Sequence, residues 1–355
     1  MDILSIKPIR DLSYRTCMIA RECVWDNLKV IMILGIVFEH TLIVYDYPHW
    51  LELIWALFIS WLMPLFTLIS GYWFKQRSVK QSLEKYLYPM LLFSAINFFI
   101  GYFFYPNYHK GLHLIGYAMW YLWALFVFAL ITPKLIKKYR IKNLLVINLI
   151  LIVIYNFIPI CAEIQTCLNA VQFNRIIGFY PFFLLGMLLN KHTLSVRYLP
   201  FYAIGTIIYM LMAILFDGFA YSSGFYIMPT FSIKQVFYLL TSYIFIGAIC
   251  LFLINITSKK ELYITKFGSR SMNVYLLHML VVFPLSWGVF SHCSYSIPLI
   301  FANAILSPFL CIYFFSDKVN HIMNKLLFNR NWSVVLFLYL MSLVLVNKSW
   351  LIPNL

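Results

Sequence analysis

Apolar stretches long enough to cross a lipid bilayer recur along almost the whole chain. A spanning helix needs about 20 mostly apolar residues. The segments that meet this requirement are 28–46, 51–74, 86–105, 114–132, 143–160, 174–190, 199–216, 235–255, 272–290, 296–316 and 332–350. The segments between them are short, so the chemistry must be done by the bundle itself. The pattern predicts an all-α, polytopic transmembrane helix bundle of about 10–11 spans.

The composition excludes the other broad classes of protein. Hydrophobic residues make up 63% of the chain and charged residues 11%, whereas a soluble domain has about 45–50% apolar and about 25% charged residues. A soluble enzyme, a disordered chain and a disulfide-stapled secreted domain are therefore excluded. An outer-membrane barrel alternates polar and apolar residues along its strands, and the unbroken apolar run 144–160 does not.

The distribution of positive charge predicts the topology. The chain has 27 Lys and Arg against 12 Asp and Glu, which gives a net charge of +15. With the N-terminus inside the cell, all but four of these cations fall in inner segments. The four outer ones are Lys110, Arg175, Lys234 and Lys348. Because cytoplasmic loops carry such an excess, we expect a cytoplasmic N-terminus and an outer C-terminus, and no nucleic-acid partner.

The first span carries ionisable residues, which are costly in a membrane and are functional candidates by default. Lys29 lies at the inner boundary, and His40 lies about 16 Å deeper on nearly the same helix face. A neutral imidazole at this depth suits general-base catalysis; the alternative is a hydrogen-bonded packing histidine. Glu39 lies about 100° around the helix from His40, so we expect each side chain to find its own partner across the bundle.

The second span and the loop after it hold a further group of candidates. Pro64 should kink the helix, and Ser70 and Gly71 allow close helix approach; simple packing is the alternative. The cations that follow are Lys75, Arg77, Lys80 and Lys85. They are either ordinary positive residues of a cytoplasmic loop, or they bind the phosphates of a cytosolic donor.

Three later features are less specific. The Trp-Tyr-Leu-Trp run at 120–123 is typical of an interfacial aromatic belt. Arg175 either snorkels at the interface, holds a polar substrate or pairs with Glu163 or Glu39. His278 is a second intramembrane histidine, about two turns inside the inner boundary, for which helix packing is the alternative.

Several of these motifs together resemble the membrane-bound acyltransferase-3 family. They are Lys29-x10-His40 within an Asp26-Asn-Leu-Lys run, Pro64-Leu-Phe-x3-Ser-Gly-Tyr72, and Ser271-x3-Tyr275-Leu-Leu-His278. The run Arg175-x5-Pro181-Phe-Phe-Leu-Leu-Gly186 is also similar to the fucose 4-O-acetyltransferase-like branch of that family. The resemblance extends from about residue 20 to about residue 320.

The resemblance implies transfer of an acyl group, usually acetyl from acetyl-CoA, to a sugar hydroxyl of a cell-surface or lipid-linked glycan. It implies that His40 is catalytic, and we add Glu39 as its neighbour. The candidate donor-binding residues are Lys29, Arg21, Asp26, Lys75, Arg77 and Lys85. The candidate substrate or structural residues are Ser70, Tyr72, Trp120, Tyr121, Arg175, Tyr275 and His278. Many members have Arg where this chain has Lys29, so the charge is kept but bidentate phosphate binding is lost.

The expected organisation has three parts. Residues 1–27 form a cytoplasmic segment, 28–320 an acyltransferase-3-like transmembrane domain, and 321–355 an extra C-terminal transmembrane helix with its tail. We expect no metal and no permanently bound cofactor, with acetyl-CoA as co-substrate. The expected partners are the glycan acceptor and membrane lipid, with a homodimer left open, and the expected location is the bacterial cytoplasmic (inner) membrane.

The competing interpretation is a transporter or flippase for lipid-linked saccharides, without acyl transfer. Such a protein is expected to show repeat halves with paired broken helices, and we find no internal repeat. A non-catalytic structural membrane partner is a third interpretation, which the ionisable residues at depth disfavour.

Overall fold

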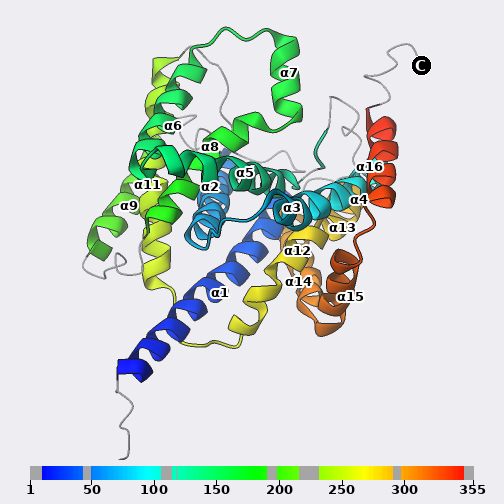
Figure 1. The fold of residues 1–355 in the computed structure, drawn as a ribbon, viewed down its shortest axis with the longest axis horizontal. Coiled ribbons are helices and arrows are strands. Elements are labelled where there is room, and N and C mark those ends of the chain that lie inside the picture. Colours follow the sequence, from blue (N-terminus) through cyan, green and yellow to red (C-terminus); the bar gives the residue numbers. More distant parts are fainter. Residues whose placement is uncertain are drawn as a thin grey trace, which may run out of the picture.

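A computed structural model describes residues 10–42, 49–104, 114–116, 118–189, 198–215, 232–290 and 297–347 (Figure 1). Side chains are described from Cys23 onward in the first helix and from Ser60 onward in the second. All regular structure within these ranges is helical, and they contain no strand. The predicted all-α bundle is thereby confirmed.

Helices follow one another through most of the described residues. The first half contains α1 (Arg10–Leu42), α2 (His49–Tyr72), α3 (Val79–Ser82), η1 (Leu83–Leu87), α4 (Tyr88–Phe104), α5 (Trp120–Lys138), α6 (Ile141–Asn156), α7 (Ala162–Ala170) and α8 (Phe173–Leu188). The second half contains α9 (Leu199–Leu215), α11 (Ile233–Ile256), η3 (Thr265–Arg270), α12 (Ser271–Leu277), α13 (Met279–Val282), η4 (Phe283–Val289), α14 (Ile297–Cys311), η6 (Ile312–Phe315), α15 (Asp317–Phe328) and α16 (Trp332–Val346).

Membrane-crossing helices are of two kinds. Within the described residues, four helical stretches are long and apolar enough to cross by themselves: Val79–Phe104, Trp120–Lys138, Ile233–Ile256 and Ile297–Phe315. Three bent pairs meet the same requirement when each is taken as one span: α7 with α8 at 54°, Thr265–Leu277 with Met279–Val289 at 44°, and α15 with α16 at 99°. The chain is therefore a multi-pass membrane protein, while the count of about 10–11 spans stays a prediction.

The structure corrects several predicted boundaries. α1 begins at Arg10, not at residue 28, because residues 10–34 contain neither Gly nor Pro and a polar sequence alone does not end a helix. The helix expected over 114–132 begins only at Trp120 and continues to Lys138. The span expected over 272–290 is interrupted at His278. Hydropathy marks where lipid begins, and it does not mark where a helix begins.

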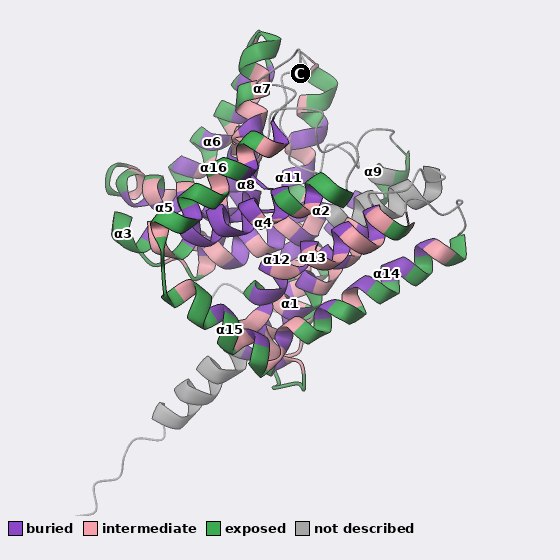
Figure 2. Ribbon diagram, turned by 90° about the vertical axis from the view of Figure 1, so that its right-hand side faces the viewer, coloured by how far each residue is buried: buried purple, intermediate pink, exposed green. Residues whose placement is uncertain are grey.

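Two glycines allow α2 and α8 to pack closely against each other. A Cβ atom at Gly71 would overlap the backbone carbonyl of Phe183, and a Cβ atom at Gly186 would overlap the backbone carbonyl of Leu68. Small residues are the usual means by which membrane helices bring their backbones together. Figure 2 shows the buried residues concentrated at the centre of the bundle, where α2, α4, α8 and α12 lie.

A polar clamp joins α1 to the segment between α11 and α12. The fully buried Asn27 amide donates to the carbonyl oxygens of Ser258 (3.1 Å) and Lys260 (3.2 Å), and its oxygen accepts from the Thr265 hydroxyl (2.6 Å). Thr265 in turn accepts from the backbone N–H of Leu262 (2.7 Å). This clamp sets where η3 and α12 start relative to α1.

We expect Asn27→Ala to destabilise the protein by about 2 kcal/mol, because three hydrogen bonds are lost and buried polar groups are left without partners. Thermal unfolding of the purified protein in detergent measures the change. The exposed Asn143 of α6 provides the control, since Asn143→Ala should alter stability by less than about 0.5 kcal/mol. Equal unfolding temperatures for the two variants would contradict the clamp.

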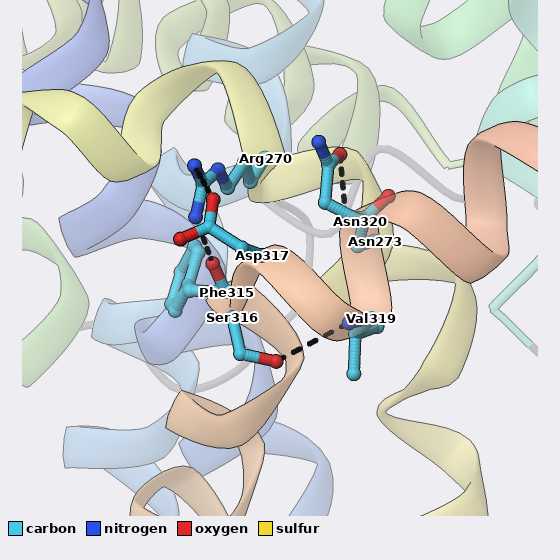
Figure 3. A network of polar contacts seen from close by, with 7 residues as sticks. All are labelled: Arg270, Asn273, Phe315, Ser316, Asp317, Val319 and Asn320. Atoms are coloured by element: carbon cyan, nitrogen blue, oxygen red, sulfur yellow. Dashed lines mark hydrogen bonds and ion pairs between the residues drawn. The ribbon is translucent and has the colours of Figure 1, made fainter.

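The same end of α12 is fastened to α15 by a second polar network (Figure 3). The Arg270 guanidinium donates to the carbonyl oxygen of Phe315 (2.7 Å) and pairs with the Asp317 carboxylate. One turn on, the Asn273 amide donates to Asn320 (3.2 Å). α12 is therefore held from both sides before it reaches His278.

Candidate active site

The side chains of Glu39 and His40 pair directly at the end of α1. The His40 Nδ1 atom lies 2.6 Å from Glu39 Oε2 and 2.9 Å from the carbonyl oxygen of Ile36. The expectation that each would find its own partner across the bundle is therefore wrong: the two side chains bend toward each other along the last turn of the helix. Their side chains are only 5% (Glu39) and 13% (His40) exposed. With Nδ1 facing two oxygen acceptors, the neutral ring keeps its proton on Nδ1 and its lone pair on Nε2.

His278 lies next to this pair. The centres of the His40 and His278 rings are 5.2 Å apart and their planes are nearly perpendicular, at 85°. His278 is fully buried at the break between α12 and α13. Two histidines from distant parts of the sequence thus meet inside the bundle, as neither motif by itself could predict.

A cavity of about 120 Å³ lies between α1, α2, α5 and α12. Its lining residues are Lys29, Ile36, Met63, Phe66, Ile69, Ser70, Tyr121, Leu125, Ser271, Met272 and Tyr275. Lys29 contributes the only charge among these residues, and Ile36 lies one helical turn before His40. The cavity therefore extends along α1 from the cation toward the histidine. Lys29 also pairs with Asp26 at 2.5 Å, one turn earlier in the helix.

The hydroxyl groups in the cavity have a defined hydrogen-bond direction. The Tyr121 hydroxyl donates to the carbonyl oxygen of Phe66 at 3.1 Å, and it lies 2.7 Å from the Ser70 hydroxyl. Because a phenol has one proton, Ser70 must be the donor to Tyr121. Ser70 is therefore left with lone pairs, and no proton, for any further partner.

A continuous series of aromatic rings connects His278 to Trp120 and Arg175, which the sequence had placed near the outer surface. The ring centres are 6.1 Å apart for His278 and Tyr275, 5.7 Å for Tyr275 and Tyr121, and 6.1 Å for Tyr121 and Trp120. The guanidinium of Arg175 lies 4.8 Å from the centre of the Trp120 ring, a cation–π distance. Trp120 and Tyr121, which belong to the predicted aromatic belt, are buried. They therefore lie inside the protein, packed against the site.

Tyr275 also contacts the residue that leads into α5. Its hydroxyl donates to the carbonyl oxygen of Ala118, which has a left-handed backbone (φ 64°) directly before the helix. The backbone amides of Tyr121 and Leu122 face the same hydroxyl. The phenol thus contacts the start of α5, which begins among buried residues.

The remaining predicted residues do not line the cavity. Tyr72 packs its ring against Trp25, with the centres 4.7 Å apart, next to Asp26 on α1. Lys75, Arg77 and Lys85 lie near the surface after α2, close enough that the charges of Arg77 and Lys75 act on Lys85. Arg21 belongs to α1, and its side chain lies outside the described residues.

Sequence reasoning missed a second polar layer near His40. The buried Asn303 of α14 accepts from Ser286 (3.2 Å) and Ser307 (3.1 Å), and its amide lies 3.5 Å from the carbonyl oxygen of Thr41. Asn303 is a neutral residue within an apolar run, whereas the ionisable residues of a span stand out in the sequence. In the described part of the chain, no three His, Cys, Asp or Glu side chains are grouped to hold a metal ion.

These features define the class of the protein: a polytopic helix bundle that encloses a histidine–carboxylate pair beside a cavity with a cation at one end. Residues 24–347 match the model of an acyltransferase domain, that of the acyltransferase-3 family, and the chain belongs to this family. It is therefore a membrane acyltransferase. The match extends through α16, which lies in the 321–355 segment expected to follow the acyltransferase-3-like domain. No curated protein and no solved structure matches the chain.

Proposed function

We propose that this acyltransferase moves an acetyl group from cytosolic acetyl-CoA to a sugar hydroxyl of a cell-surface or lipid-linked glycan, in the bacterial cytoplasmic membrane. The proposal places the chain in the fucose 4-O-acetyltransferase-like branch, on the motif that begins at Arg175. The observation that carries it is the Glu39–His40 pair at 2.6 Å, one helical turn from a cavity that begins at Lys29.

The donor site follows from charge and length. CoA carries phosphates at one end and a thioester at the end of a long pantetheine arm. Lys29 and the cations after α2 offer positive charge at the predicted cytoplasmic end, and His40 lies about 16 Å deeper along α1, a rise similar to the length of that arm. The mostly apolar lining of the cavity, with the Ser70 and Tyr121 hydroxyls at its side, suits an arm that alternates methylene and amide groups.

In the direct route, His40 acts as a general base. Its Nε2 atom removes the proton of the sugar hydroxyl, and the oxygen forms a bond to the thioester carbonyl carbon. The carbon–sulfur bond then breaks, and the departing thiolate takes the proton from His40. The products are the O-acetyl ester and free CoA. Glu39 orients the ring and stabilises the imidazolium that forms between the two proton transfers. In the alternative route, His40 accepts the acetyl group itself and passes it to the hydroxyl.

Purified protein incubated with radiolabelled acetyl-CoA and an oligosaccharide acceptor tests the proposal directly. We expect label to appear in the saccharide as an alkali-labile ester. Label that stays on CoA with every acceptor, while saccharide is carried across vesicle membranes, would instead support the transporter interpretation. Mass spectrometry of surface glycan from a deletion strain identifies the acceptor.

The double substitution Arg77→Ala and Lys85→Ala should raise the KM for acetyl-CoA about fivefold at low salt, with kcat nearly unchanged, because two cations near the surface each contribute about 0.5 kcal/mol to phosphate binding. Added salt should reduce the difference from the wild-type protein. Lys142→Ala removes an exposed cation from the start of α6 and is the control. If the control raises the KM equally, the effect belongs to overall charge and not to a donor site.

A further inference from the structure

The direction of α15 differs from that of the helix that follows it. α15 has 12 residues and meets α16 at 99°. α16 carries exposed apolar residues on almost all sides, which is typical of a helix that crosses a membrane. A helix at right angles to a crossing helix runs parallel to the membrane surface. In the predicted topology, α15 lies on the cytoplasmic side.

Contacts with α12 fix which face of α15 points toward the protein. The side chains of Asp317 and Asn320 bond to residues at the start of α12 (Figure 3). Val319 and Met323 are buried between α15 and the rest of the bundle. α15 is therefore held in one rotational position about its own axis, and its other faces point in fixed directions.

A second face of α15 carries large apolar side chains that stay exposed. Ile322 is 53% exposed and Leu326 is 40% exposed. The two residues are four positions apart, so they lie one helical turn apart on the same side of the helix. Exposed apolar side chains that share one side mark a contact surface, either for a membrane or for a protein partner.

The lysines of α15 favour a membrane as that partner. Lys318 precedes Ile322 by four residues and Lys325 follows it by three, so both lysines lie beside the apolar pair. Both are exposed. Apolar side chains flanked by lysines are typical of a helix that lies in the membrane interface, where long cationic side chains reach the lipid head groups. Cations at this level attract anionic lipids.

We propose that α15 lies in the cytoplasmic interface of the bilayer and binds anionic phospholipids. Ile322 and Leu326 enter the boundary of the acyl chains, and Lys318 and Lys325 bind the phosphates of the head groups beside them. Because α15 is fastened to α12, the proposal also places the start of α12, and with it one wall of the cavity, at the level of the lipid head groups.

Cysteine accessibility tests the orientation of α15. Ile322→Cys and Asn324→Cys both replace exposed residues, on opposite sides of the helix. The full chain is placed in lipid nanodiscs, where both faces of the bilayer are open to a membrane-impermeant maleimide. We expect Asn324→Cys to react about tenfold faster or more, because only Ile322 faces lipid. Mass spectrometry of the α15 peptide separates this label from label on the natural cysteines. Equal rates for the two variants would overturn the proposal.

Lipid crosslinking tests the charge contacts. Phosphatidylglycerol with a photoreactive head group should label α15 in the wild-type chain, and the double substitution Lys318→Gln and Lys325→Gln should reduce this label about tenfold. Label on residues 134–142, which contain other exposed lysines, is the control in the same sample and should change less than about twofold.

Three results would count against lipid binding by α15. An equal fall of label at both places would overturn the proposal, because the effect would then belong to overall charge. Absence of label on α15 in the wild-type chain would overturn it without any variant. Protection of Ile322→Cys without lipid label on α15 would overturn it in favour of contact with a second copy of the chain.

Discussion

His40→Ala is expected to lower acetyl transfer by about 10³-fold, in the middle of the range that a positioned general acid–base group contributes. The substitution removes the imidazole that pairs with Glu39 and lies one helical turn from Ile36, a lining residue of the cavity. It leaves the KM for acetyl-CoA within about threefold, because Lys29 and the loop cations are unchanged. Initial rates with radiolabelled acetyl-CoA measure both parameters.

Unfolding measurements must show that the His40→Ala protein still folds and inserts, and a second histidine variant serves as the control. His321→Ala removes an exposed histidine of α15 and should leave the rate and the unfolding temperature unchanged. Transfer by His40→Ala at more than about one tenth of the wild-type rate would mean that another group removes the hydroxyl proton. Intact unfolding behaviour together with lost transfer would assign the effect to chemistry.

The second large effect is structural. Gly71→Ala and Gly186→Ala should each destabilise the protein by about 3 kcal/mol or more, because each new methyl group meets a backbone carbonyl of the facing helix and α2 and α8 must separate. We expect little folded protein from either variant. Ser70 precedes Gly71, so separation of the helices also shifts the Ser70 hydroxyl relative to Tyr121. Thermal unfolding and residual acetyl transfer report the two consequences.

The same substitution at Gly247 should have the opposite effect on stability. Gly247 lies inside α11, and a Cβ atom there would meet only the Leu185 side chain, at an ordinary 3.8 Å. Ala in place of Gly inside a helix is favourable by about 0.5–1 kcal/mol when space permits, so Gly247→Ala should be neutral or slightly stabilising. Similar destabilisation by all three substitutions would show that the close α2–α8 contact is not what makes Gly71 and Gly186 necessary.

Much of the site could be predicted from the sequence, because intramembrane polar residues are few. Lys29, His40, Ser70, Tyr121, Tyr275 and His278 all lie in or beside one region of the bundle. Helical spacing places Lys29 and His40 on one face without any knowledge of tertiary structure. The family match supports the acyltransferase assignment that the same motifs had indicated.

The contacts between distant segments could not be predicted in this way. The separation of His40 and His278 depends on how α1 packs against the interrupted α12–α13 helix, and no local pattern contains that information. The Glu39–His40 pair was missed for a different reason. Ideal helix geometry points neighbouring side chains in different directions, whereas two flexible side chains can bend toward each other when both are removed from water.

The hydrogen-bond direction at Tyr121 limits which chemical groups can rest beside it. Tyr121 donates its only proton to the carbonyl oxygen of Phe66, and Ser70 donates its proton to Tyr121. A ligand group that forms a hydrogen bond with this wall must therefore be the donor. The N–H of an amide meets this condition. A bare carbonyl, a thioester oxygen or a phosphate would instead face the serine lone pairs and be repelled. This wall of the cavity thus selects hydrogen-bond donors over acceptors. An amide that binds beside it is therefore oriented with its N–H toward Ser70.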